Sequence, residues 1–136
     1  MSFKWPALLL LLVSTSSHAY EFPLEIFEYV NDVKVVAFIN KDDIDDSMSW
    51  NPFEEPPKLT IANVVDIIKK HITTNQELAG AELTEIELRQ IPHHEKHWHY
   101  MVKLKTVEDN KRKYHYILIL MNGKVIPAIR EPESFK

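Results

Sequence analysis

HWHYMVKLK, residues 97–105, and YHYILIL, residues 114–120, are the two stretches that decide the fold of this chain. In the first stretch, aromatic and aliphatic side chains alternate with histidine, methionine and lysine, which is the period of a β-strand. The second stretch leads into Asn122-Gly123, a strong signal for a hairpin turn. These patterns predict four antiparallel strands in the second half of the chain. The predicted strands are Thr84 to Ile91, His97 to Lys105, Tyr114 to Leu120 and Lys124 to Ile129.

The pairing of the two long strands follows from placing their large side chains on one face. This register puts His99 opposite Ile119 and Met101 opposite Ile117. The second face would then be mixed, and we expect it either to be covered by the N-terminal part of the chain or to bind a partner. The expected helix-facing core consists of Trp98, Tyr100, Leu118 and Leu120, packed against Ile61, Val65 and Ile68.

One amphipathic helix is predicted over Thr60 to Ile72. Thr60 has the side chain of an N-cap residue, and basic side chains near the end of the segment complement the helix dipole. Apolar residues recur at the spacing of one helix face, so the helix has one surface to bury. The apolar residues of this face are Ile61, Val64, Val65, Ile68 and Ile72.

A β-hairpin is predicted near the N-terminus. Its strands are Leu24 to Val30 and Val33 to Ile39, with Asn31-Asp32 as a two-residue turn. Both faces of this hairpin carry apolar side chains, so either the rest of the domain or a second subunit must cover each of them. The predicted fold class is therefore α+β: an N-terminal β-hairpin and one amphipathic helix packed on an antiparallel sheet of about four strands.

Residues 41–58 form a long acidic loop without a periodic pattern. The loop can be a solvated connection or, since clustered carboxylates suit a hard cation, a calcium site. It lacks the spacing and the glycine of an EF-hand. Trp50 and Phe53 within it either anchor the loop to the domain or contact a partner.

The first nineteen residues resemble a secretory signal peptide. Lys4 provides the positive charge, residues 5–13 the short apolar core, and Ser17-His18-Ala19 a cleavage site of the small-x-small type. The apolar core is too short to span a bilayer, so we expect a periplasmic or secreted protein without a membrane anchor. Residues 20–136 would form a single α+β domain.

Composition excludes several classes of function. The net charge is −4, which gives the chain no electrostatic reason to bind nucleic acid. The absence of cysteine excludes disulfides, thiol catalysis and cysteine-ligated zinc. Gly80 and Gly123 are the only glycines, too few for a phosphate-binding loop or a dinucleotide fingerprint, and no serine has a G-x-S-x-G context. We therefore expect no enzyme activity.

Histidines are concentrated between residues 93 and 99. The segment is one residue short of the H-E-x-x-H zinc motif, but two loop histidines followed by an H-x-H pair on a strand could bind Zn or Cu. The alternative is that these residues are ordinary polar side chains of a loop and a sheet edge. The candidate metal ligands are His93, His94, His97 and His99.

The second half of the chain resembles the small extracytoplasmic PepSY-like domains. A helix followed by TEIELRQI, HWHYMVKL and YHYILILMNGKVI carries this resemblance over about residues 60–129. The chain departs from that family in its N-terminal hairpin, in its acidic loop, and in having Met121-Asn122 where an acidic residue often precedes the turn. The resemblance implies interaction with partners and transfers no catalytic residues.

These observations together predict an exported, non-catalytic binding or interaction module. A metal-binding protein that uses the histidine cluster is the first alternative, and a hydrolase with an unrecognised site is the second. The partner would be another protein or a second copy of the chain. The candidate partner-binding residues are Trp50, Phe53, Ile117 and Ile119.

Overall fold

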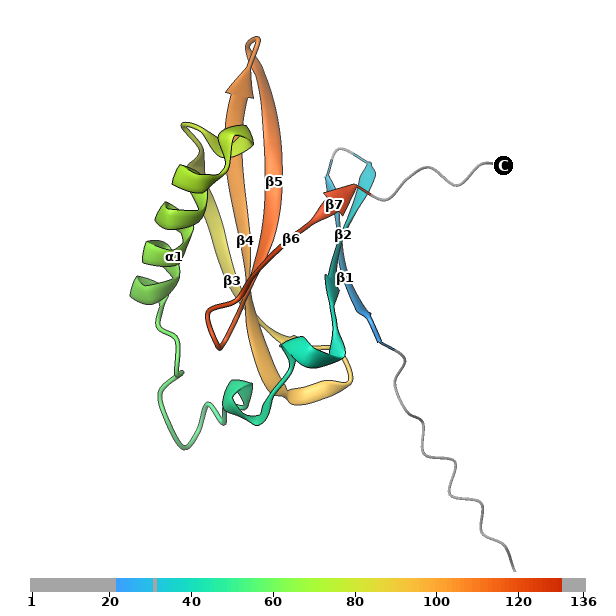
Figure 1. Ribbon diagram of the computed structural model, residues 1–136, viewed down its shortest axis with the longest axis vertical. Coiled ribbons are helices and arrows are strands. Elements are labelled where there is room, and N and C mark those ends of the chain that lie inside the picture. Colours follow the sequence, from blue (N-terminus) through green and yellow to red (C-terminus); the bar gives the residue numbers. More distant parts are fainter. Residues whose placement is uncertain (1–21, 31, 131–136) are drawn as a thin grey trace, which may run out of the picture.

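A computed structural model describes residues 22–30 and 32–130 and shows an α+β fold in three layers, a helix and two antiparallel β-sheets (Figure 1). The predicted signal peptide lies outside the described residues. Within the described part of the chain, no helix is long and apolar enough to cross a membrane.

The middle layer is a four-stranded sheet with the order β3-β4-β5-β6, as the sequence predicts for the second half of the chain. Three of its strands, β3, β4 and β5, are longer than expected, and the fourth, β6, is shorter. The strands β4 and β5 extend into the hairpin that joins them. The strands are β3 (Glu82–Ile91), β4 (His94–Glu108), β5 (Lys111–Leu120) and β6 (Val125–Pro127).

The second sheet contains the predicted N-terminal hairpin, β1 (Leu24–Val30) and β2 (Val33–Ile39). Its third strand is β7 (Ile129–Arg130), which pairs with β2. We expected one strand over 124–129, and this expectation is wrong, because the chain leaves the four-stranded sheet after Pro127. Ala128 N still donates a hydrogen bond to Tyr116 O of β5 at 3.2 Å, and the chain then pairs with β2. Pro127 fits here because β6 is an edge strand, where a residue without an N–H breaks no ladder bond.

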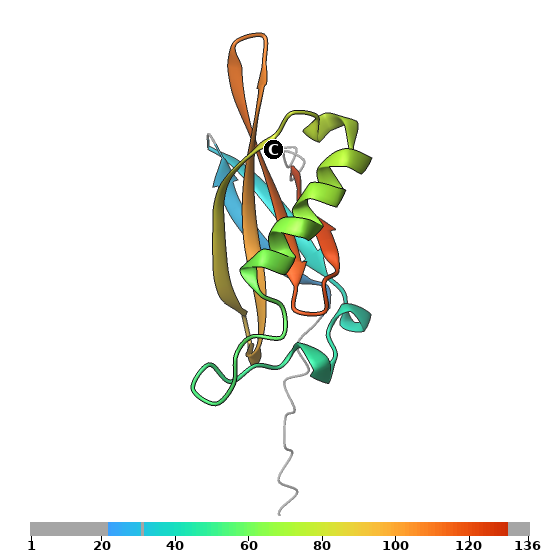
Figure 2. The ribbon, with the colours of Figure 1, turned by 90° about the vertical axis from the view of Figure 1, so that its left-hand side faces the viewer.

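The helix α1 (Ile61–Thr74) covers one face of the four-stranded sheet (Figure 2). Thr60 is its N-cap, and Thr60 Oγ1 accepts a hydrogen bond from Asn63 N at 3.2 Å. Asn63 Oδ1 accepts one from Thr60 N at 3.1 Å in return. Short 3₁₀ turns flank the helix in sequence: η1 (Lys41–Asp43), η2 (Asp46–Met48) and η3 (Gln76–Leu78).

The register between β4 and β5 differs from the predicted one by one residue. His99 pairs with Leu120 and Tyr100 with Ile119. A two-residue turn, Asp109-Asn110, joins Glu108 to Lys111, and both turn residues have positive φ. A turn of this kind fixes the register of a hairpin, and the shift of one residue exchanges the faces of β5 relative to the prediction.

The face beneath α1 therefore contains Tyr100, Ile117 and Ile119. Tyr100 Oη donates a hydrogen bond to the carbonyl oxygen of Leu59, immediately before the helix, at 2.6 Å. Ile117 and Ile119 are buried, so these two proposed partner contacts belong to the core. The opposite face carries His99, Met101, Leu118 and Leu120, and the three-stranded sheet covers it. The residues of that sheet in the common core are Leu24, Ile26, Ala37 and Ile39.

Candidate functional site

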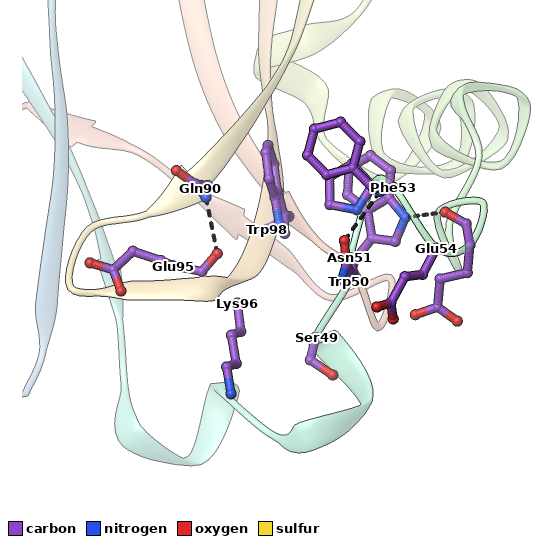
Figure 3. A pocket seen from close by; sticks show the side chains of 11 residues that line it. Ser49, Trp50, Asn51, Phe53, Glu54, Gln90, Glu95, Lys96 and Trp98 are labelled. Atoms are coloured by element: carbon purple, nitrogen blue, oxygen red, sulfur yellow. Dashed lines mark hydrogen bonds between the residues drawn. The ribbon is translucent and has the colours of Figure 1, made fainter.

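A pocket of about 750 Å³ lies between the acidic loop and the β3–β4 hairpin (Figure 3). Figure 3 shows Gln90, Glu95 and Lys96 on the hairpin side and Trp50 and Phe53 on the loop side, with Trp98 between them. Its lining consists of Ser49, Trp50, Asn51, Pro52, Phe53, Glu54, Glu55, Gln90, Glu95, Lys96 and Trp98.

The loop side of the pocket is tied to β4. Ser49 forms an isolated antiparallel bridge with His97, and Trp50 N donates a hydrogen bond to Lys96 O at 2.9 Å. The preceding Met48 is fully buried and anchors this part of the loop in the core. The loop backbone is therefore fixed where it meets the sheet.

Local hydrogen bonds shape the loop beyond this point. Trp50 Nε1 donates to the carbonyl oxygen of Glu55 at 2.8 Å, which closes the segment between them. Asn51 Oδ1 accepts a hydrogen bond from Phe53 N at 3.2 Å, the pattern of an Asx turn. On the other side, Gln90 Nε2 donates to Glu95 O at 3.0 Å and holds the β3–β4 hairpin together.

Aromatic side chains form the apolar part of the pocket. The rings of Trp50 and Trp98 meet edge to face, with centroids 5.1 Å apart and an interplanar angle of 70°. Trp98 Nε1 is buried and has no hydrogen-bond partner among the described residues. Phe53 is 99% exposed, so its ring contributes apolar surface that the domain itself does not use.

The charged side chains of the lining are mainly acidic. Glu54 and Glu55 come from the loop and Glu95 from the hairpin, against one cation, Lys96. An aromatic surface beside carboxylates favours a ligand with both apolar and positively charged parts, because the ring face and the carboxylate each attract a cation.

Most of the other carboxylates of the acidic loop lie at its surface, and Asp43 is the exception. Asp43 is buried, accepts a hydrogen bond from Asn40 N at 2.7 Å and forms an ion pair with Lys124. Burial acts to raise the pKa of Asp43, but the hydrogen bonds and the positive charge of Lys124 outweigh it, so the pKa is lowered. The Asp43 carboxylate therefore holds the loop to the β5–β6 turn. Its oxygens already have partners within the protein, which argues against a role as a calcium ligand.

The predicted histidine ligands are spread over different environments. His93 is exposed in the β3–β4 turn. The rings of His94 and His97 are neighbours, with centroids 5.9 Å apart. His99 is 1% exposed and lies between the two sheets. Residues 22–30 and 32–130 contain no group of three or more histidine, aspartate or glutamate side chains that could hold a metal ion.

Burial has a large effect on His99. Removal from water lowers the pKa of His99 to about 4, and the nearby Arg89 guanidinium acts in the same direction. The imidazole is therefore neutral at physiological pH, as expected for a side chain packed between two sheets.

Sequence reasoning identified only part of the pocket. Trp50 and Phe53 were predicted either to anchor the loop to the domain or to contact a partner, whereas Trp98 was assigned to the core beneath the helix. The sequence analysis did not identify Gln90, Glu95 or Lys96 as candidate binding residues. The bridge that brings the loop against the hairpin joins residues distant in sequence, and no local pattern marks it.

Comparison with protein-family models, with curated proteins and with solved structures finds no match to this chain. The geometry of the pocket is therefore the main basis for a functional proposal.

Proposed function

We propose that this chain is an exported, non-catalytic binding module that takes up a peptide segment of a protein partner. The observation that carries the proposal is the pocket in which Trp50 and Trp98 are in contact and Phe53 is left exposed. Its volume of about 750 Å³ is within the usual range of ligand sites, about 300–1,000 Å³. Tryptophan is among the side chains that contribute most to binding energy at protein interfaces, and phenylalanine is enriched there.

The ligand chemistry follows from the charges of the lining. Glu54, Glu55 and Glu95 favour a lysine or arginine side chain of the partner, whose aliphatic part would lie along the tryptophans. The proposed ligand is therefore a basic peptide segment with an apolar neighbour.

The lining supports binding better than catalysis. Its hydroxyl group, Ser49 Oγ, donates a hydrogen bond to Asp46 O at 2.8 Å and is not held by a base. The pocket lining includes no histidine that could act as one. The resemblance of residues 60–129 to PepSY-like domains supports the same interpretation, since it implies interaction with partners.

A display library of random dodecapeptides tests the proposal. We expect the protein to select peptides rich in lysine or arginine, and their affinities are then measured by fluorescence anisotropy. Phe53→Ser should weaken the selected peptides at least about tenfold, because it removes a fully exposed aromatic contact. The matched control is Val107→Ser, an exposed apolar residue at the opposite end of β4, which should leave the affinity unchanged.

Equal affinity of the Phe53→Ser protein and the wild type would exclude this pocket as the binding site. Selection of acidic peptides would contradict the proposed ligand class.

The exported location rests on residues 1–19 alone. Intact mass of the protein recovered from outside the cytoplasm should show a chain that begins at Tyr20. Recovery of a chain that retains residues 1–19 would contradict the proposed localisation.

A further inference from the structure

The outer face of the three-stranded sheet is apolar. On β1 this face carries Glu25, Phe27 and Tyr29, since the alternate residues Leu24 and Ile26 are buried in the core. The residues directly opposite them on β2 are Phe38, Val36 and Lys34, and Val36 is in turn opposite Ile129 of β7.

Large apolar side chains remain exposed there. Phe27 is 49% exposed, Tyr29 64% and Ile129 53%. They surround Val36, which is already buried at the centre of the face. In Figure 1 this sheet lies on the side of the domain away from α1, and no described element lies beyond it. An apolar cluster of this kind on one face of a sheet marks an interaction surface.

The charges on the face have an arrangement that is complementary to itself. Glu25, opposite Phe38, lies at one end of the strands, and Lys34, opposite Tyr29, lies at the other end. The backbone positions of Phe27, Val36 and Ile129 lie between these two charged residues. The Lys34 side chain reaches back over this apolar centre, with Nζ 4.9 Å from the centroid of the Phe27 ring. Consider a second copy related to the first by a twofold axis that lies in the interface plane and runs perpendicular to the strands. Glu25 of the second copy would then lie over Tyr29 of the first copy, beside Lys34 of the first copy.

We propose that a second copy of this chain covers this face in an isologous, face-to-face dimer. Both copies then contribute the same surface, and each Glu25 carboxylate meets the Lys34 ammonium of the other copy. The Phe27 rings of the two copies lie near the twofold axis, between the two stacked sheets. Each Lys34 ammonium, which lies over the Phe27 ring of its own copy in the monomer, turns toward Glu25 of the other copy in the dimer. A twofold axis parallel to the strands would instead place Glu25 over Phe38, without a charge partner. The charges therefore select the antiparallel arrangement of the two copies.

The inference does not depend on the pocket. The pocket lies between the loop and the β3–β4 hairpin, while the dimer face consists of β1, β2 and β7. The dimer would present two pockets to a partner.

Sedimentation velocity over micromolar to millimolar concentrations tests the dimer, on both the full chain and the chain that begins at Tyr20. The expected result is a reversible monomer–dimer equilibrium. Phe27→Lys should abolish the dimer, because it places two like charges near the twofold axis. Val107→Lys, which also places a lysine at an exposed apolar position, is the matched control and should dimerise as the wild type does.

A charge exchange tests the arrangement of the two copies. Glu25→Lys alone and Lys34→Glu alone should each weaken dimerisation about tenfold, because each breaks two symmetric ion pairs. The double variant should recover the wild-type dissociation constant. Thermal melting of each variant as a monomer checks that it folds.

Three results would overturn the proposal. They are a monomer at all concentrations, a dimer that Phe27→Lys does not weaken, and a double charge exchange that fails to restore the dimer. A monomer that co-sediments with lipid vesicles would assign the face to a membrane surface instead. Peptide binding that survives Phe27→Lys would leave the proposed function intact, so the two proposals can fail separately.

Discussion

The two sheets of this protein differ in how many of their faces are covered. In β5, Leu118 and Ile119 are neighbours that point to opposite faces, and both are fully buried, one beneath the three-stranded sheet and one beneath α1. In β1, Ile26 and Phe27 are also neighbours that point to opposite faces, but only Ile26 is buried. Both strands have apolar residues on both faces. In the four-stranded sheet each face is covered by another layer, whereas no described residue covers the outer face of the three-stranded sheet.

The largest expected effect separates these two situations. Leu118→Ala should lower the free energy of unfolding by about 3–4 kcal/mol, because it opens a cavity between two packed layers. Phe27→Ala should lower it by less than about 1 kcal/mol when measured on the monomer, since half of its surface already faces water. Urea unfolding followed by tryptophan fluorescence measures both values.

A loss of similar size for Phe27→Ala at monomer concentrations would break the comparison. It would mean that another part of the chain covers the outer face.

The next prediction concerns the dependence of stability on pH, which reports on the covered face between the two sheets through His99. His99 is neutral between the sheets with a pKa of about 4, below the ordinary value of 6.5 that applies to the unfolded chain. As the pH falls below about 6.5, this histidine binds a proton in the unfolded state but not in the folded state. The free energy of unfolding therefore decreases until the pH reaches about 4. This difference in pKa corresponds to a loss of about 3 kcal/mol.

His99→Leu has a similar volume and no titratable group, so its stability should fall by about 3 kcal/mol less than that of the wild type between pH 7 and pH 4. Chemical unfolding of both proteins at the two pH values isolates the histidine from the carboxylates. Parallel losses in the two proteins would show that His99 is hydrated in solution.

The smallest effect concerns the charged contact between the sheets. Arg89 of β3 pairs with Glu28 of β1 and also with Glu87, and these contacts raise the pKa of Arg89. All three side chains are partly exposed, so water and salt screen the interaction. A double-mutant cycle with Glu28→Gln and Arg89→Met should give a coupling of about 0.5–1 kcal/mol that decreases in 1 M salt. A coupling above about 2 kcal/mol would mean that the ion pair, and not apolar packing, holds the two sheets together.

Much of the fold could be predicted from local patterns. The bounds of the N-terminal hairpin agree with the structure, and the capping residue Thr60 marks the start of α1. Leu118 and Leu120 of the predicted helix-facing core lie on the opposite face of the sheet, because the Asp109-Asn110 turn that sets the register of β5 was not recognised. Ile61, predicted in the same core, is 61% exposed at the start of α1. The split of the last strand at Pro127 was missed for a related reason, since a change of sheet depends on which distant strand is free to pair.

The candidate site was less predictable than the fold. The composition of the loop pointed to Trp50 and Phe53, but the role of Trp98 depends on the bridge between Ser49 and His97. The sequence pattern correctly places His97 and His99 on one strand, β4. It does not indicate that a second sheet covers His99. Contacts between segments far apart in sequence decide both cases.

The pairing of β7 with β2 has a consequence for how this chain reaches its native state. Val35 lies opposite Arg130, so the three-stranded sheet joins residues from nearly opposite ends of the described chain. Pairings between such distant residues form slowly, because a long loop must close before any contact is gained. The helix and the β4–β5 hairpin, in contrast, depend on contacts between residues close in sequence. Until Ile129 and Arg130 pair with β2, this strand has an open hydrogen-bonding edge, which exposes the folding chain to pairing with another molecule.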